Sequence, residues 1–463
     1  MDPSTILIFV LMGLFIGLLF LGVPVGFALG GSAMAVTTIA VVLDAVFGVY
    51  TGLSYLRFSI TVDRVFGIMK SEVLVALPMF ILMGNILDRS GVAEKMMLAQ
   101  QKILGRVSGG LALAVTLMGI LLAASTGIIG ASVVLLGTLT LPAMMRVNYS
   151  PSFAAGTVCS AGTLGILIPP SIMLILMSTQ LDVSTGDLFM GAVFPGLVLS
   201  GLYLLYIVVY AQLNPSAAPK PKEIVKLRPR DWIESALAIL PALFLIMLVL
   251  GSIFFGIATP TESSGMGALG AMILAFSNRR LNLKSLRKSL HDTMSTMGFL
   301  AAILIGATCF SLVLRRLGGD EMIANAILGV GSGDYGTIFV ILAIIFILGF
   351  FLEWIEITMI MLPIVAPIIG GMDLAWLADS GMEATSKPAL IWFAILCSVA
   401  LQTSFLTPPV GFALFYIKGV CPPEIKLKHL YRGVVPFIVI QLIALALVVV
   451  FPKLVTWLPG VSY

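Results

Sequence analysis

The sequence predicts an all-α polytopic membrane protein, built as an inverted repeat with two re-entrant hairpins and two broken helices. Hydrophobic residues fill 59% of its 463 positions and charged residues only 10%, whereas a soluble domain carries about 25% charged residues. Many apolar stretches approach the roughly 20 residues that span a bilayer. Two Pro-Pro pairs interrupt such stretches, and several motifs recur in the same order in both halves.

The clearest spanning segments are apolar runs at 5–23, 188–210, 234–254 and 433–452. No basic segment precedes the first run and no small-residue cleavage site follows it, so we expect a retained helix and not a signal peptide. The four cysteines lie far apart, mostly in apolar segments, which indicates packing and not a metal site. The net charge of +4 sits in a few short loops, so nucleic-acid binding is not expected.

Loop charges predict the orientation in the membrane, because Lys and Arg accumulate on the cytoplasmic side. With both termini periplasmic, most of the 26 basic residues fall in cytoplasmic segments. These segments are 89–106, 214–232, 278–291 and 418–432, together with Arg146.

This topology holds only if the segments at about 107–146 and 334–370 each enter and leave on one side. Each is long enough for two half-length arms but not for two full spans. We therefore expect two re-entrant hairpins and roughly ten spanning helices. The first hairpin opens to the cytoplasm and the second to the periplasm.

Motifs of the first half recur in the second half. The matched pairs are 87–94 with 314–321, Pro142 with Pro367, and Pro169-Pro170 with Pro408-Pro409. The last interval is longer, which fits an insertion in the loop 371–388. Two similar halves whose hairpins open to opposite sides are typical of inverted-repeat transporters.

The Pro-Pro pairs predict breaks within the apolar stretches 160–171 and 401–411. Proline lacks a backbone donor and restricts the residue before it, so two in succession open a helix. Freed carbonyl and hydroxyl oxygens suit a hard cation such as sodium, and half-helix N-termini suit an anionic substrate group. The alternative is a packing kink whose hydroxyls cap their own helix.

The predicted hairpin tips, 124–132 and 349–358, carry matching chemistry. The first is small and hydroxylated. The second holds Glu353 and Glu356, which share a helical face, and acidic residues inside a membrane are functional candidates. Glu353 is favoured because it lies nearer the tip, whereas Glu356 can equally pair with a backbone amide or a basic group.

Two other features have two interpretations each. The amphipathic stretch 89–106 is either an arm between a moving and a fixed domain or an interfacial helix anchored by its basic residues. Glu262 is either a structural cap at a helix start, which is favoured, or a residue with a role in chemistry.

The chain resembles the large membrane subunit, DctM type, of the tripartite ATP-independent periplasmic (TRAP) transporters over nearly its whole length. The resemblance rests on Leu77–Gly84, Ala258–Ser263, Ile168–Ser171 and Thr407–Phe415. The stretches 401–415 and 352–357 look most like the branch associated with mannitol, chloroaromatic or 2-oxoacid substrates. Many members have a shorter, less acidic second tip with a proline where Trp354 stands, so ion coordination there departs from the family pattern.

The resemblance implies an elevator-type fold similar to the ion-transporter superfamily, in a bacterial inner membrane. It implies a small four-helix membrane subunit (Q type), expected as a separate chain, and a periplasmic substrate-binding protein (P type). The substrate would be a small organic acid such as a 2-oxoacid, imported by a sodium gradient without ATP. Scaffold segments would be 1–106, 186–333 and 419–463, and transport-domain segments 107–185 and 334–418.

By position, the resemblance also implies the sites. Sodium site 1 would comprise Ser125, Gly127, Ser160, Gly162 and Thr163. Sodium site 2 would comprise Glu353, Thr403, Ser404 and Thr407. Substrate would lie between the tips, near Ser132, Thr163, Pro170, Thr358 and Pro409. No organic cofactor and no metal other than sodium is expected.

Other functional classes make different predictions. A stand-alone carboxylate symporter or exchanger with the same repeat would need no binding protein. A channel would need a continuous polar pore, whereas the polar groups here cluster at two breaks. An intramembrane enzyme would need Ser/His, paired Asp or His-Glu motifs on facing helices, which the sequence lacks, so we expect no enzyme.

Overall fold

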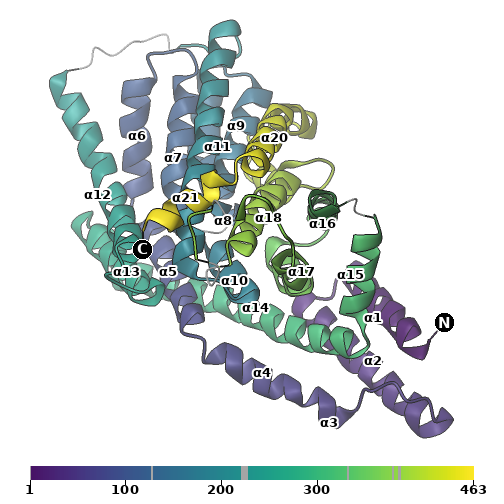
Figure 1. The fold of residues 1–463 in the computed structure, drawn as a ribbon. Helices are drawn as coiled ribbons and strands as arrows, with labels where there is room; N and C mark the ends of the chain where they lie inside the picture. Colours follow the sequence, from purple (N-terminus) through teal and green to yellow (C-terminus); the bar gives the residue numbers. More distant parts are fainter. Residues whose placement is uncertain are drawn as a thin grey trace.

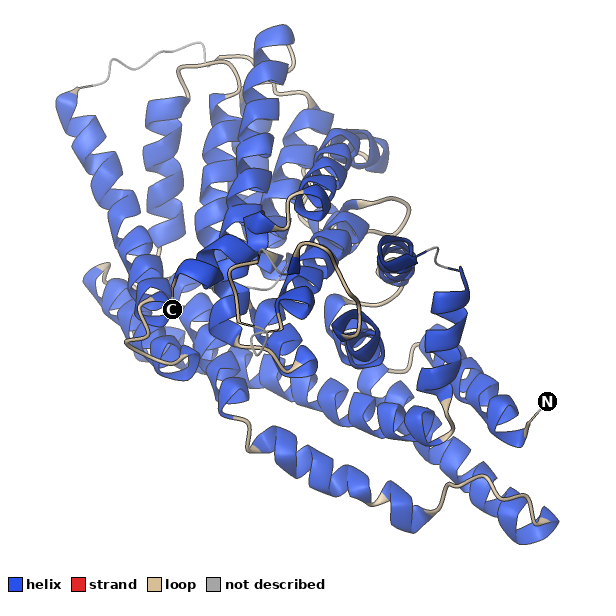
Figure 2. Ribbon diagram, in the orientation of Figure 1, coloured by secondary structure: helices blue, strands red, loops and turns tan. Residues whose placement is uncertain are grey.

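Helices account for all the regular structure that the computed structural model describes (Figure 2). The described residues are 2–126, 129–220, 228–330, 333–377, 380–383 and 387–462, with the side chains of 123–126 excepted. Within these ranges eight helices are long and apolar enough to cross a membrane, or up to ten if each of two bent pairs counts as one span. The all-α polytopic prediction is confirmed.

The first half of the chain runs from α1 to α11 (Figure 1). Its helices are α1 (Pro3–Phe20), α2 (Val25–Phe47), α3 (Tyr55–Phe58), α4 (Ile60–Met69), α5 (Glu72–Arg89), α6 (Val92–Leu104), α7 (Gly110–Thr126), α8 (Ile129–Arg146), α9 (Pro151–Thr163), the 3-10 helix η1 (Leu164–Ile166), α10 (Ile172–Leu181) and α11 (Thr185–Leu213).

The second half runs from α12 to α21. Its helices are α12 (Pro229–Phe254), α13 (Pro260–Ser277), α14 (Leu283–Arg316), α15 (Gly319–Val330), α16 (Gly333–Leu348), α17 (Trp354–Gly370), α18 (Pro388–Leu406), α19 (Phe412–Lys418), α20 (Leu427–Val450) and α21 (Lys453–Val461).

Both predicted breaks are present. Helix α9 has 13 residues and α10 has 10, so each covers about 15–20 Å, roughly half of a bilayer core of about 30 Å. The chain between them passes through η1 and Pro169-Pro170. In the second half α18 ends before Pro408-Pro409 and α19 begins after it, and both Pro-Pro bonds are cis.

The two predicted hairpins are also present as paired helices. Helices α7 and α8 pack against each other and then against α9. Helices α16 and α17 do the same with α18. Figure 1 shows α16, α17 and α18 grouped together, with α15 beside them.

Contacts between the halves are reciprocal, as a repeat requires. Helix α2 packs on α14, and its counterpart α13 packs on α5. Helix α10 contacts α17 of the second hairpin, and α19 contacts α8 of the first hairpin. Each broken helix therefore reaches across to the hairpin of the other half.

Small residues allow the closest helix crossings. A Cβ atom at Gly306 would clash with the carbonyl oxygen of Gly26, where α14 crosses α2. A Cβ atom at Gly433 would clash with the carbonyl of Ser152, where α20 crosses α9. Close backbone approach through small residues is the usual way in which membrane helices gain packing energy.

Residues 92–104 of the amphipathic stretch form α6, which packs against α12 and α7 and buries Val92, Met96 and other residues. Both an inter-domain arm and an interfacial helix are compatible with this packing. Polar contacts reinforce it: Lys102 pairs with Asp231 of α12, and this hydrogen bond raises the pKa of Lys102. Lys102 is partly exposed whereas Asp231 is largely buried, so the pair adds to the attachment that the apolar face of α6 provides.

The cap predicted at Glu262 is confirmed. Its Oε2 accepts hydrogen bonds from the backbone amide of Thr259 at 2.8 Å and from the Thr259 hydroxyl at 2.9 Å. The Glu262 amide donates back to the Thr259 hydroxyl at 3.3 Å. This reciprocal capping box starts α13.

Candidate functional site

The two broken helices touch through a hydrogen bond between equivalent positions. Gln402 Nε2 on α18 donates to Thr163 Oγ1 on α9 at 3.2 Å, and the two residues are 239 positions apart. The same interval separates Pro169 from Pro408. Both side chains are fully buried. The approximate symmetry axis of the repeat therefore passes through this contact.

Most of the first predicted sodium site comes together beside this contact. Ser160 Oγ donates to the Gly156 carbonyl at 2.8 Å, and Thr163 Oγ1 donates to the Ser160 carbonyl at 2.9 Å. A hydroxyl that donates to its own helix keeps oxygen lone pairs for a further partner. Gly127 and the side chain of Ser125 lie outside the described residues.

The first hairpin meets α9 at Gly162. A Cβ atom there would come within 3.0 Å of the Val133 Cα atom on α8, so only glycine permits this approach. Ser132, next in the chain to Val133, is buried. The chain positions of the predicted substrate residues Ser132 and Thr163 are therefore close together, because each is adjacent to one of the two residues in this contact.

The second predicted sodium site shows a similar pattern on α18. Thr403 Oγ1 donates to the Val399 carbonyl and Thr407 Oγ1 to the Thr403 carbonyl, both at 2.7 Å. Ser404 is fully buried, and its hydroxyl has no hydrogen-bond partner among the described residues. A Cβ atom at Gly349 would clash with that hydroxyl, so Ser404 lies against the end of α16, next to the hairpin turn.

Helices α17 and α18, which pack against each other, carry four buried oxygens that lack partners. Within the described part of the chain they are Glu356 Oε2, Thr358 Oγ1, Gln402 Oε1 and Ser404 Oγ. Buried polar atoms nearly always have a partner, because leaving one unpaired costs about 1–3 kcal/mol. Two such oxygens on each of two contacting helices make this region a candidate for binding a cation, which takes oxygen ligands.

The two acidic residues differ in their environment. Glu353 is the N-cap residue of α17 and is half-buried. Glu356 is in the first helical turn and only 2% exposed. A negative charge is favoured at a helix N-terminus, but here only Glu356 also presents an unpartnered buried oxygen. Sequence reasoning preferred Glu353 for its position and did not select Glu356.

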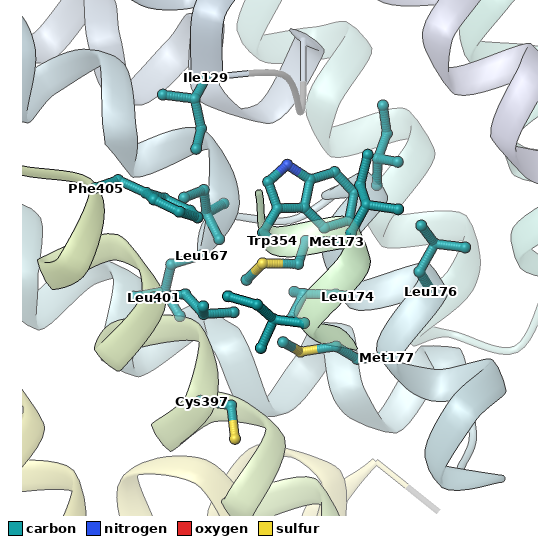
Figure 3. Packing of buried hydrophobic residues seen from close by; sticks show 14 of the residues in the cluster. Ile129, Leu167, Met173, Leu174, Leu176, Met177, Trp354, Cys397, Leu401 and Phe405 are labelled. Carbon is teal, nitrogen blue, oxygen red and sulfur yellow. The ribbon is translucent and has the colours of Figure 1, made fainter. Parts of the chain in front are cut away.

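Trp354 holds the second hairpin tip in place. Its side chain is 2% exposed. Figure 3 shows it in one cluster with Met173 and Leu174 of α10 and with Leu401 and Phe405 of α18. Trp354 is therefore a packing anchor, and its indole fixes the start of α17 against both broken helices.

Sequence reasoning missed Tyr416 of α19. A Cβ atom at Gly130 of the first hairpin would lie 3.0 Å from the Tyr416 ring. The phenol is also within electrostatic range of Glu353 and Glu356 of the second hairpin. Tyr416 therefore lies between the two hairpins. The contact of α19 with α8 was the missing information, since nothing in the local sequence distinguishes this tyrosine.

Gln402 was also missed, although it occupies the position equivalent to Thr163 in the repeat. Aligning the two Pro-Pro pairs and counting back would have identified it.

The remaining predicted substrate residues do not all lie in the same environment. Pro170 and Thr358 are buried, whereas Pro409 is exposed and its carbonyl accepts a hydrogen bond from the Tyr431 hydroxyl at 2.9 Å. The structure does not place Pro409 with the buried group.

The donor set determines what the site can bind. It is rich in hydroxyl, amide and carboxylate oxygens, which are the ligands of hard cations. Among the described residues, no three His, Cys, Asp or Glu side chains are grouped as a metal site would require. Paired hairpins meeting paired broken helices, with buried oxygens at their junction, define a membrane transporter of the inverted-repeat class.

The chain belongs to the DctM component family of tripartite ATP-independent periplasmic transporters, whose family model matches residues 12–454. It is 31% identical over 86% of its length to the C4-dicarboxylate TRAP transporter large permease protein DctM of Pseudomonas aeruginosa, covering 87% of that protein. It is 28% identical over 97% of its length to the isethionate TRAP transporter permease protein DctMQ of Oleidesulfovibrio alaskensis, covering 66% of that protein.

A solved structure shares the fold. The crystal structure of the Alcanivorax borkumensis YdaH transporter, reported to have an unusual topology, matches with a TM-score of 0.53 and 13% identity. The match covers 84% of this chain and 90% of that chain. The family predicted from the sequence is thus confirmed, and the chain is a multi-pass large permease subunit.

Proposed function

We propose that this permease imports a small organic acid across a bacterial inner membrane, driven by a sodium gradient. The observation that carries the proposal is the group of four unpartnered buried oxygens on α17 and α18. The two relatives above are named for a C4-dicarboxylate and for isethionate. Both are small organic anions, which supports an anionic substrate here.

A cation accounts for the buried oxygens. Glu356 brings a carboxylate into the interior, and Thr358, Gln402 and Ser404 add neutral oxygens. Leaving one oxygen of a charged, buried carboxylate without a partner would be costly, and a bound sodium ion would remove that cost. Thr403 and Thr407, which donate to their own helix, would add oxygen lone pairs from the same turns. Glu353 would lie at the edge of this second site.

The first site would use Ser160, Thr163 and the backbone around Gly162, with the hairpin tip containing Ser125 and Gly127 closing it. Gln402 would link the two sites, because its Nε2 holds Thr163 while its Oε1 has no partner. Substrate would bind between the hairpin tips, near Ser132 and Thr358. Sodium would supply positive charge that offsets the carboxylate of the substrate.

The reciprocal contacts of hairpins and broken helices support a division into two domains. Segments 107–185 and 334–418 would form a transport domain that moves as one body, since α10 packs on α17 and α19 on α8. Segments 1–106, 186–333 and 419–463 would form the scaffold. Substrate would cross by an elevator movement of the first against the second.

Two further subunits complete the proposal. A small Q-type membrane subunit would bind the scaffold, and a periplasmic P-type binding protein would deliver substrate. The relative named DctMQ is longer than this chain, which covers 66% of it. A single longer chain in that relative is compatible with two separate membrane chains here.

The test is uptake into proteoliposomes that contain this chain and its Q-type partner. Radiolabelled succinate and pyruvate serve as probes, with and without the binding protein, and with an inward sodium or potassium gradient. We expect uptake only with both the binding protein and sodium. Uptake without the binding protein would favour a stand-alone symporter or exchanger, and uptake that follows only a proton gradient would refute sodium coupling.

A further inference from the structure

A cavity with several polar lining residues lies away from the four buried oxygens, at the boundary between the proposed domains. Its volume is about 370 Å³, which is within the range of small-molecule sites. Helices α4 and α14 of the scaffold form one wall, and α10 and α17 of the transport domain form the other. The polar lining residues are Arg64, Ser71, Thr179, Gln180, Thr308, Ser311 and Arg315.

The lining is positively charged. It contains two arginines and no carboxylate. Arg64 is also within electrostatic range of Arg316, as well as of Arg315. Within the described part of the chain none of these three arginines forms an ion pair with an acidic side chain. Like charges gathered in a recess create a positive potential that attracts anions.

The cavity and the proposed second site share helix α17. Its lining residues Met359 and Pro363 follow Glu356 by three and seven positions, so all three share one helical face. Arg315 Nη2 also donates to the Pro363 carbonyl at 3.4 Å, which joins the scaffold to the transport domain. Under the topology predicted from loop charges, this cavity opens toward the periplasm, where substrate arrives.

We propose that this cavity is an antechamber for the anionic substrate, in which Arg64 and Arg315 attract its acidic group before it reaches the hairpin tips. The inference rests on the proposed function, because it takes the organic acid as the occupant. The hydroxyl and amide groups of Ser311, Thr308 and Gln180 would donate further hydrogen bonds to acid oxygens. Movement of α17 against α14 would break the Arg315 contact and release the anion inward.

The test measures the potential in the cavity directly. The permease, with its Q-type partner, is reconstituted in neutral phosphatidylcholine liposomes after Cys309→Ala and Cys421→Ala, with Ser311→Cys on the cavity wall. The other two cysteines are buried. Negatively and positively charged methanethiosulfonate reagents are added outside at low ionic strength, and the ratio of their modification rates is recorded.

We expect the negatively charged reagent to modify the introduced thiol faster than the positively charged reagent. Arg64→Gln and Arg315→Gln should each lower the ratio roughly fivefold, the effect of one unit charge about 8 Å away in water on reagents of opposite sign. Arg64→Lys should preserve the ratio. Arg146→Gln is the matched control, since it removes the same charge at the end of α8, a helix that contributes no residue to the cavity lining. An equal fall with Arg146→Gln would overturn the assignment.

A second arm identifies the occupant. Millimolar succinate should slow modification of the introduced thiol, and its uncharged diamide should not. Protection should be lost in Arg64→Gln. Protection by anionic lipid in the liposomes, with none by succinate, would assign the arginines to lipid headgroups and overturn the proposal.

The two proposals fail separately. If sodium-driven uptake is absent while the rate ratio responds to Arg64→Gln, the anion site stands and the proposed transport function fails. If uptake is sodium-driven while neither arginine changes the ratio, the antechamber fails and the transport function stands.

Discussion

Replacing Glu356 by Gln keeps the size of the side chain and removes its negative charge. Glu356 is 2% exposed, and its Oε2 has no partner among the described residues. If that oxygen binds sodium, the variant loses a contact between charged groups, which contributes about 1.5–3 kcal/mol. At 1.4 kcal/mol per factor of ten, the sodium concentration for half-maximal uptake should rise roughly 10- to 100-fold.

The assay is initial uptake of radiolabelled substrate into proteoliposomes as external sodium is varied, with maximal rates compared at saturating sodium. Glu353→Gln is the matched control, because Glu353 lies three positions away at the half-buried N-cap. Its effect should be smaller. An unchanged sodium dependence in Glu356→Gln, with a large change in Glu353→Gln, would refute the assignment and restore the choice made from sequence.

Three further predictions concern stability, measured as thermal unfolding in detergent. Thr163→Val should lower the free energy of unfolding by about 1–3 kcal/mol, because it leaves the buried Gln402 amide without its hydrogen-bond acceptor. The double variant with Gln402→Leu should lose less stability than the sum of the two single variants. Additive losses would show that the two side chains do not interact. Gly433→Ala should lower the free energy of unfolding by about 1–3 kcal/mol, because the added methyl group overpacks the helix crossing. Gly201→Ala should be tolerated, because no atom lies within 4 Å of the added Cβ. Equal effects of the two changes would contradict the crossing geometry. Lys102→Met should destabilise the protein by the same amount throughout the neutral pH range. The pKa of Lys102 is raised in the folded protein, so the stability from its ion pair is complete below the ordinary pKa of 10.5 and is lost only as the pH rises through the raised value. An effect that disappears between mildly acidic and neutral pH would contradict this.

Local sequence was sufficient for the helices, the breaks and the hairpins. Proline chemistry determines where α9 and α18 end, and apolar runs determine the spans, so these features followed from residue type. The capping box at Glu262 was likewise local, because its partners are three residues apart.

The site required contacts that no local pattern contains. Gln402 became a candidate only when α18 was seen to touch α9, and Tyr416 only when α19 was seen beside α8. Glu356 outranked Glu353 because burial, which depends on how α17 packs on α18, differs between them. Trp354 resembled a change in a binding site, whereas its surroundings in Figure 3 are those of a core residue.

The most direct test of the central claim, a sodium site at the junction of the second hairpin and the second broken helix, is ion-specific stabilisation of the purified protein. Thermal unfolding is followed as NaCl replaces KCl at constant ionic strength, for the parent, for Glu356→Gln and for Ser404→Ala. A ligand at 100 times its Kd stabilises by about 2.7 kcal/mol. We predict a sodium-specific rise in Tm that both variants reduce. Equal stabilisation by sodium and potassium, or a sodium effect that neither variant changes, would contradict the site.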